Sequence, residues 1–180
     1  MHKAYAACHT DRMLLRPAEP DDAIDVARVH VRAWQAGYRG LLAQEYLDGL
    51  RAEDRARRYD FANADPSQPA TRVAVVDGLV RGFVTTMPAR DAAAPASGEL
   101  CALYVDPDWW GRGLGAALVA AARARLREQG FRDALLWLLA GNRRGERFYR
   151  GDGWVADSTV RKDVVWGVAV DEVRYRRALD

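Results

Sequence analysis

Residues 105–116 read VDPDWWGRGLGA and contain the turn on which the predicted fold depends. They join an apolar run predicted as a strand, residues 98–105, to a run predicted as a long helix, residues 113–129. Glycines let the backbone turn sharply and approach a ligand closely, and the free N–H groups at a helix start favour an anion. Successive amides in such a turn form an anion-binding nest, to which an arginine can add a charge-assisted contact. The stretch therefore predicts a phosphate-binding turn made of Gly111, Arg112, Gly113, Leu114, Gly115 and Ala116.

Two alternative roles for this turn stay open. A Gly-rich turn can simply begin a helix, and positions 111, 113 and 116 also fit the dinucleotide pattern G-x-G-x-x-G/A. The dinucleotide hypothesis is the weaker one, because residues 106–110 separate the motif from its strand. It also lacks a second βαβ half and the acidic residue that should follow about 20 residues on. The lysine of a P-loop is absent, which excludes a P-loop NTPase.

Hydrophobic spacing and turn residues predict the other elements outward from this turn. Asp77-Gly78 between two apolar runs predicts a tight hairpin, and the apolar run at residues 134–139 predicts a buried strand. The other predicted strands are residues 13–17, 73–76, 79–85, 154–164 and 168–177. The other predicted helices are residues 20–36, 44–63, with an interruption near Gly49, and 142–150. This order predicts an α/β (α+β) fold with a single mixed, mostly antiparallel central sheet flanked by helices. We expect one domain at residues 11–178 after a short extension, residues 1–10.

Composition narrows the class of protein. A chain of 180 residues, 49% hydrophobic and 29% charged, suits one globular domain. Its net charge of +2 argues against a nucleic-acid partner, and no apolar run is long enough to span a membrane. The first eight residues lack the apolar core of a signal peptide, so we expect a cytoplasmic protein. Cys8 and Cys101 cannot form a disulfide framework, and without a CxxC motif we expect no metal.

Two segments resemble the GNAT superfamily of N-acetyltransferases, and the resemblance covers residues 13–177. LYVDP at residues 103–107, leading into GRGLG at 111–115, resembles the family's acetyl-CoA motif, Q/R-x-x-G-x-G/A. NRRGERFYRGDGW at residues 142–154 resembles the family's N-x-x-A-x-x-F-Y-x-x-x-G-F/W segment. The two occur in the family's order, separated by one helix and one strand. Trp110 departs from the Q/R position, which removes a side-chain contact to pyrophosphate, and Gly145 weakens its helix slightly.

The resemblance implies a sheet whose fourth and fifth strands splay apart. Acetyl-CoA is then the expected cosubstrate, and its pantetheine arm would lie along Leu103, Tyr104 and Val105 like an added strand. Asn142 is expected to cap the following helix and to hydrogen-bond the same arm. We expect direct acetyl transfer in a ternary complex to a primary amine of a small-molecule or peptide acceptor. A non-catalytic acyl-CoA-binding or sensing module is the alternative, and a homodimer is one open oligomeric state.

Candidate catalytic residues follow from the chemistry of acetyl transfer. By resemblance, Tyr149 is the general acid for the coenzyme sulfur, and the alternative is a core aromatic paired with Phe148. Glu99 is the candidate general base, because a charge inside an apolar strand is costly unless it is used or paired. The alternative for Glu99 is an acid at the strand's start facing solvent. Cys101 could carry the acetyl group covalently, but we prefer a small buried thiol with no activating neighbour.

The region between the first two predicted helices walls the acceptor site in the family. Trp34, Tyr38 and Arg39 are therefore candidate acceptor-binding residues. The alternative is that Trp34 belongs to the core and that Tyr38 and Arg39 only form the turn. None of the histidines has metal-ligand spacing, and His30 is expected to be structural rather than a base; the three are His2, His9 and His30.

Overall fold

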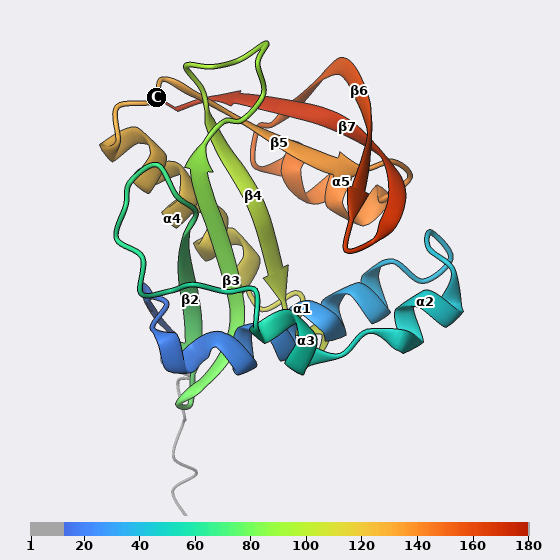
Figure 1. Cartoon of the computed structure of the whole chain (residues 1–180). Helices are drawn as coiled ribbons and strands as arrows, with labels where there is room; N and C mark the ends of the chain where they lie inside the picture. The colour runs from blue at the N-terminus through green and yellow to red at the C-terminus, as the bar shows by residue number, and fades with distance from the viewer. Residues whose placement is uncertain (1–12, 180) are drawn as a thin grey trace, which may run out of the picture.

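The computed structural model of the chain describes residues 13–179 (Figure 1). The predicted extension at residues 1–10 lies outside this range, as do Cys8, His2 and His9. Within the described range the strands form one seven-stranded sheet in the order β1-β2-β3-β4-β5-β7-β6. Neighbouring strands are antiparallel except β4 and β5, which are parallel. The predicted class, a single mixed and mostly antiparallel sheet flanked by helices, is confirmed.

The elements follow the predicted order closely. The strands are β1 (Leu14–Pro17), β2 (Ala70–Val76), β3 (Leu79–Pro88), β4 (Gly98–Val105), β5 (Asp133–Leu139), β6 (Val155–Val165) and β7 (Val168–Ala178). The α-helices are α1 (Ala23–Gly37), α2 (Gln44–Gly49), α3 (Ala52–Ala56), α4 (Leu114–Glu128) and α5 (Arg143–Gly151). Short 3₁₀ turns precede α1 and α4, at Pro20–Asp22 and Pro107–Trp109.

The parallel strands β4 and β5 separate soon after they begin. They pair only at Gly98 with Ala134 and at Glu99 with Leu135. On its other edge β4 stays paired with β3, but its register shifts at Cys101, because Leu100 and Ala102 face consecutive residues of β3. Such a β-bulge adds one residue to a strand and bends it. The sheet therefore opens between β4 and β5, as the resemblance implied.

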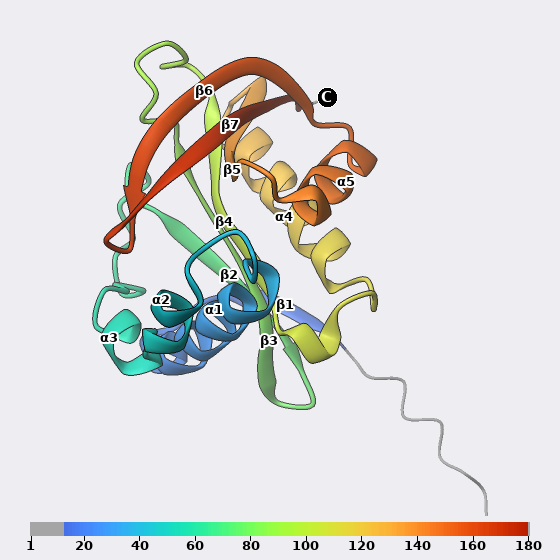
Figure 2. The same ribbon diagram turned by 90° about the vertical axis from the view of Figure 1, so that its right-hand side faces the viewer.

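Helices cover both faces of this sheet (Figure 2). On one face α4 and α5 bury a core that includes Leu118 and Leu126 of α4. On the other face α1 buries a smaller core that includes Val26 and Val29. We call these faces the α4–α5 side and the α1 side. The opening between β4 and β5 therefore connects two covered faces of one sheet.

The helix predicted over residues 44–63 is wrong in its second half. The interruption predicted near Gly49 is confirmed, because α2 ends at Gly49 and α3 begins at Ala52, but α3 already ends at Ala56. Tyr59 and Phe61 instead stack on each other, with ring centroids 5.0 Å apart, and both pack against the core of the α1 side. Residues two apart point to different sides of a helix, so joint burial of this pair requires an extended backbone.

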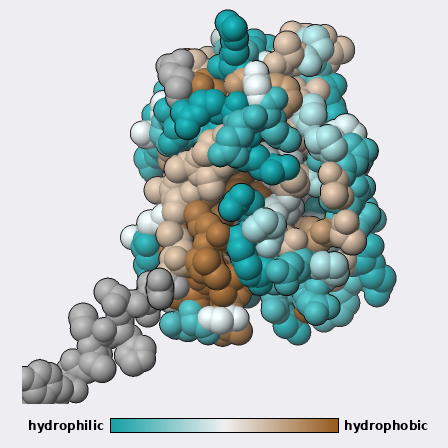
Figure 3. All heavy atoms as spheres, turned by 90° about the vertical axis from the view of Figure 1, so that its left-hand side faces the viewer, coloured by the Kyte–Doolittle hydropathy of each residue, from teal (hydrophilic) through white to brown (hydrophobic). Residues whose placement is uncertain are grey.

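The predicted hairpin turn is confirmed. Asp77 and Gly78 join β2 to β3, and both have positive φ, 52° and 75°, as a tight two-residue hairpin turn requires. Figure 3 shows a face that is mostly hydrophilic, with a hydrophobic area beside the point where the described chain begins. Among the described residues no helix is long and apolar enough to cross a membrane.

Candidate active site

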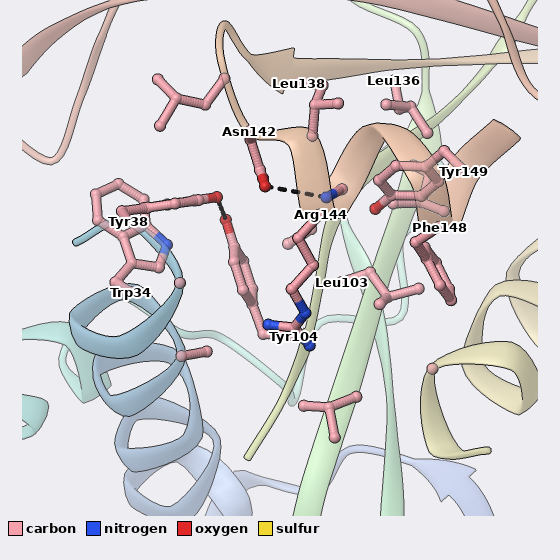
Figure 4. Close-up of a pocket in the computed structure, with 18 of the residues that line it drawn as sticks. Trp34, Tyr38, Leu103, Tyr104, Leu136, Leu138, Asn142, Arg144, Phe148 and Tyr149 are labelled. Atoms are coloured by element: carbon pink, nitrogen blue, oxygen red, sulfur yellow. Dashed lines mark hydrogen bonds between the residues drawn. The ribbon is translucent and has the colours of Figure 1, made fainter. Parts of the chain in front are cut away.

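A cavity of about 510 Å³ lies where β4 and β5 diverge. Residues from both faces of the sheet line it, so it has an α4–α5 side and an α1 side. Figure 4 shows α1 and the α5 region on opposite sides of it, with β4 passing between them. The predicted site residues that line it are Trp34, Tyr38, Glu99, Leu103, Tyr104, Val105, Gly111, Gly113, Gly115, Ala116, Asn142 and Tyr149. Most of the predicted site is therefore brought together in one cavity.

The Gly-rich turn forms the entrance to α4 on the α4–α5 side. Gly113 is the N-cap of α4 with φ of 85°, a conformation that favours glycine, and no side chain caps the helix. The first N–H groups of the helix therefore need partners from outside the helix. Gly115 packs closely against α5, because a Cβ there would lie 3.2 Å from the Phe148 ring. The turn thus exposes amides to the cavity and also lets the two helices approach.

Arg112 and Leu114, both predicted to hold phosphate, do not line the cavity with their side chains. The Arg112 guanidinium lies over the Trp109 ring, 4.7 Å from its centroid. The Leu114 side chain is buried in the core of the α4–α5 side. Arg112 could contact a ligand only after leaving the Trp109 ring, while Leu114 can contribute its backbone amide. Their roles at the site stay predictions.

Trp110 takes a structural position where the family motif has Gln or Arg. Its indole Nε1 donates a hydrogen bond to the Val105 carbonyl oxygen at 2.8 Å, which ties the turn to the end of β4. Its ring carries the Arg144 guanidinium, 3.1 Å from the ring centroid. Arg144 comes from the first turn of α5 and lines the cavity (Figure 4). A cation thus lies beside the position where the motif's own polar residue is missing.

Sequence reasoning did not single out Arg144. Partial burial lowers the pKa of its guanidinium, and no carboxylate pairs with it among residues 13–179. In the sequence it is one of many arginines, and only the fold brings α5 beside the turn. An unpaired cation facing a cavity is an electrostatic signal for an anionic ligand.

Asn142 has the capping role that the sequence predicted. Its side-chain oxygen accepts a hydrogen bond from the Gly145 N–H at 3.0 Å. A Cβ at Gly145 would lie 2.7 Å from Leu138 Cδ1 and 2.8 Å from Asn142 Nδ2, so a larger residue would have to displace the ends of both side chains. Gly145, which stands where the family segment has alanine, therefore makes room for the side chains of Leu138 and Asn142, and both of these line the cavity.

Tyr149 is both a core aromatic and a cavity residue. Its ring packs edge-on against Phe148 and Trp154, with centroid distances of 5.1 and 6.1 Å. Its side chain is buried, yet among the described residues the hydroxyl has no hydrogen-bond partner. Figure 4 shows the hydroxyl turned toward the cavity. Burial raises the pKa of the phenol, so it keeps its proton at neutral pH.

Glu99 faces the cavity rather than open solvent. Burial raises the pKa of its carboxyl, and the Arg90 backbone N–H donates a hydrogen bond to it at 3.3 Å. Cys101, at the bulge, also lines the cavity, but it is exposed, whereas the sequence predicted a buried thiol. Desolvation by the protein around the thiol still raises its pKa well above the usual range. A thiol that rarely ionises is a poor nucleophile. The structure thus favours Glu99 as the available base and leaves Cys101 unactivated.

The α1 side contains two of the three predicted acceptor residues. Trp34 and Tyr38 line the cavity, and the Tyr38 hydroxyl lies 3.1 Å from the Tyr104 hydroxyl. Arg39 does not line it and lies in the turn after α1. His30 is a core residue, as expected. A ring nitrogen of His30 lies 2.8 Å from the Tyr59 hydroxyl, and burial lowers its pKa well below the usual range.

Three further residues of the α1 side were not foreseen: Trp137 of β5, Arg161 of β6 and Glu172 of β7. The Arg161 guanidinium lies 4.1 Å from the centroid of the Trp137 ring and donates to Glu172 at 2.7 Å. At the tip of the β6–β7 hairpin, Trp166 packs on Trp34 with a centroid distance of 4.4 Å. Strand alternation predicts that every second residue shares a face, but not which face meets a cavity. Among residues 13–179 no cluster of three His, Cys, Asp or Glu side chains could hold a metal ion.

Comparison with known proteins assigns the family. The model of the Acetyltransferase (GNAT) family matches residues 31–154, which include β4, the Gly-rich turn and α5. The chain belongs to the GNAT acetyltransferase family. An uncharacterized N-acetyltransferase of Archaeoglobus fulgidus is 32% identical over 139 residues, 76% of this chain and 89% of that protein. The uncharacterized N-acetyltransferase YuaI of Bacillus subtilis is 29% identical over 131 residues, 71% of this chain and 72% of YuaI.

A solved GNAT structure supports the same fold. The PaiA N-acetyltransferase of Thermoplasma acidophilum, crystallised in complex with coenzyme A, has a TM-score of 0.70 to this chain. The two are 17% identical, and the match covers 93% of this chain and 99% of that one. These comparisons confirm the predicted family, the predicted fold and the enzyme class, an acetyl-CoA-dependent N-acetyltransferase.

Proposed function

We propose that this GNAT protein transfers the acetyl group of acetyl-CoA directly to a primary amine, with both substrates bound in the cavity between β4 and β5. The observation that carries the proposal is that the cavity joins two chemically different sides. An anion-binding turn and a buried phenol lie on one side, and the half-buried Glu99 carboxylate lies in the wall that leads to the other. A two-sided cavity suits a reaction between two substrates that approach from opposite faces of a sheet.

The α4–α5 side fits coenzyme A. The free amides at the start of α4 suit a pyrophosphate, which the helix dipole also favours. Arg144 supplies the cation that the motif lacks at Trp110. Beyond Glu99, β4 has no β5 partner, so its edge at Leu103, Tyr104 and Val105 is available to the amides of a pantetheine arm. Asn142 keeps its side-chain NH₂ free, because only its oxygen is used in the cap.

Acetyl-CoA supplies the acetyl group as a thioester, and two residues of this chain manage the protons. Glu99 accepts a proton from the bound ammonium, directly or through water, and leaves a neutral amine to attack the thioester. The second proton of this nitrogen passes to solvent as the amide forms. Tyr149, which holds its proton at neutral pH, donates it to the departing sulfur as the carbon–nitrogen bond forms and the carbon–sulfur bond breaks. Glu99 then gives its proton to solvent, and Tyr149 regains one from solvent. Unpaired N–H groups on the β4 edge are the donors available to the carbonyl oxygen.

Direct transfer is favoured over a covalent acetyl-cysteine. The Cys101 thiol lines the cavity, but desolvation by the surrounding protein, first, and the charge of Glu99 raise its pKa. Among the described residues its one hydrogen bond is to the Glu99 carbonyl oxygen, at 3.8 Å, and not to a histidine or lysine that could activate it. A non-catalytic acyl-CoA-binding module is not favoured, because it would not need a buried phenol without a partner beside a half-buried carboxyl.

The test measures release of free thiol from acetyl-CoA in the presence of primary amines. Amine-dependent release, with initial-rate patterns that require both substrates before any product leaves, is expected. Binding of acetyl-CoA without amine-dependent release from any acceptor would favour the binding module. Release of one equivalent of coenzyme A before amine is added, leaving acetyl on the protein, would contradict direct transfer.

A further inference from the structure

We infer that the acceptor is a primary amine on an apolar body with no carboxylate beside the amine. This inference rests on the proposed function and concerns the α1 side of the same cavity. The walls there are largely apolar and aromatic, and the residues that form them are Trp34, Tyr38, Leu42, Trp137, Val165 and Val170. An acceptor with an apolar body would bury its surface against these side chains.

The charged groups in this part of the cavity are not balanced. Glu99 makes no salt bridge among the described residues, and its carboxylate accepts a hydrogen bond from a backbone N–H rather than from a cation. Glu172 also lines the cavity and is buried, with 9% of its surface exposed. Glu172 is paired with Arg161, so Glu99 is the carboxylate that faces this largely apolar space without an ion pair. It attracts an ammonium group and repels another carboxylate, and both effects are strong where water is scarce.

Arg161 is the cation that could reverse this conclusion, but its charge is already matched. Its Nε donates to Glu172 at 2.7 Å, and its guanidinium lies 3.2 Å from the Asp163 carboxylate. One face of the guanidinium lies over Trp137. An arginine held between two carboxylates and an aromatic ring offers little net charge to a third carboxylate. The local charge therefore stays negative, which disfavours an amino acid as acceptor.

The test compares acceptors that differ only in a carboxylate. 2-Phenylethylamine and L-phenylalanine form one pair, and tryptamine and L-tryptophan form another. We expect kcat/KM for acetylation to be at least about tenfold higher for the amine of each pair, because the Glu99 carboxylate, which has no ion pair, repels another carboxylate. We expect the same order in equilibrium binding to protein saturated with coenzyme A. Equal values, a preference for the amino acids, or no binding of any of the four would overturn the inference.

Two neighbouring acids of β7 supply matched variants. Glu172→Gln removes one carboxylate from Arg161 and should lower the amine-to-amino-acid ratio at least about threefold, because the guanidinium charge is then less compensated. Asp171→Asn changes an exposed acid that pairs with Lys162 outside the cavity and should leave the ratio unchanged. An unchanged ratio in a folded Glu172→Gln variant contradicts the role given to Arg161. If that variant does not fold, the wild-type comparison still decides.

The two readouts separate this inference from the proposed function. Faster acetylation of the amino acids would leave the transferase intact and overturn the inference. Tighter binding of the amines without any acetyl transfer would support the inference and overturn the proposed function. Thiol release with every acceptor at one rate would also overturn the inference, because the cavity would then not distinguish a carboxylate.

Discussion

Replacing Arg144 by alanine should weaken coenzyme A binding without disturbing the fold. The guanidinium has no carboxylate partner among residues 13–179 and rests on Trp110, whose own hydrogen bond to Val105 does not depend on it. A hydrogen bond to a charged group contributes about 1.5 to 3 kcal/mol. Arg144 is partly exposed to solvent, so the lower end of this range applies. A loss of about 1.5 to 2 kcal/mol is expected, which raises Kd about 10- to 30-fold.

The assay is calorimetric titration of coenzyme A into wild type, Arg144→Ala and the matched control Arg143→Ala. Arg143 is the adjacent exposed arginine and does not line the cavity, so its removal should change Kd less than about twofold. A second comparison uses S-acetylpantetheine, which has no pyrophosphate. Arg144→Ala should bind this fragment as tightly as wild type does. An equal loss for the fragment and for coenzyme A, or no loss for either, would refute the pyrophosphate contact.

Three other substitutions test the remaining roles. Tyr149→Phe should lower kcat at least about tenfold with little change in coenzyme affinity, since it removes only the proton donor; unchanged turnover would exclude the general-acid role. Gly113→Val should abolish detectable coenzyme binding in titrations, because a β-branched residue cannot easily adopt the φ of 85°. Glu99 has a raised pKa, so kcat/KM should rise with pH through a limb above the usual carboxyl range as Glu99 loses its proton. Glu99→Gln should remove that limb, and a limb that persists would assign the base elsewhere. The raised pKa also means that the folded protein holds the Glu99 proton more tightly than the unfolded chain does. The free energy of unfolding should therefore decrease as pH rises through the pKa of Glu99. Glu99→Gln should lose this pH dependence of stability.

The sequence predicted those parts of the fold that depend on interactions between residues close together in the chain. Asp77-Gly78 fixed a hairpin through its positive φ angles, and β4 begins and ends at the predicted residues, 98 and 105. The Asn142 cap was also visible, because a capping side chain bonds an amide three residues away. The helix predicted over residues 44–63 failed beyond Ala56, because tertiary packing of Tyr59 and Phe61 overrode a weak helical pattern.

The sequence predicted those site residues that belong to a recognisable motif. It did not predict those that reach the cavity from distant segments of the chain. The turn at residues 111–116 and Tyr149 came from motifs that lie next to the cavity. Arg144, Arg161 and Glu172 reach the cavity only because α5 and the β6–β7 hairpin close over it. Arg112 is the opposite case, because it belongs to the motif but its side chain lies on the Trp109 ring and does not line the cavity. The motif alone does not show this contact.

The central claim is that coenzyme A binds in the opening between β4 and β5 with its pyrophosphate on the turn before α4. A crystal structure of the complex with coenzyme A tests this most directly. We predict pyrophosphate oxygens within hydrogen-bond distance of the backbone N–H groups of residues 113–116 and of the Arg144 guanidinium. We also predict a pantetheine arm paired with β4 at residues 103–105 and a sulfur close to the Tyr149 hydroxyl. Coenzyme A bound outside this opening, or with its pyrophosphate away from the turn, would contradict the claim.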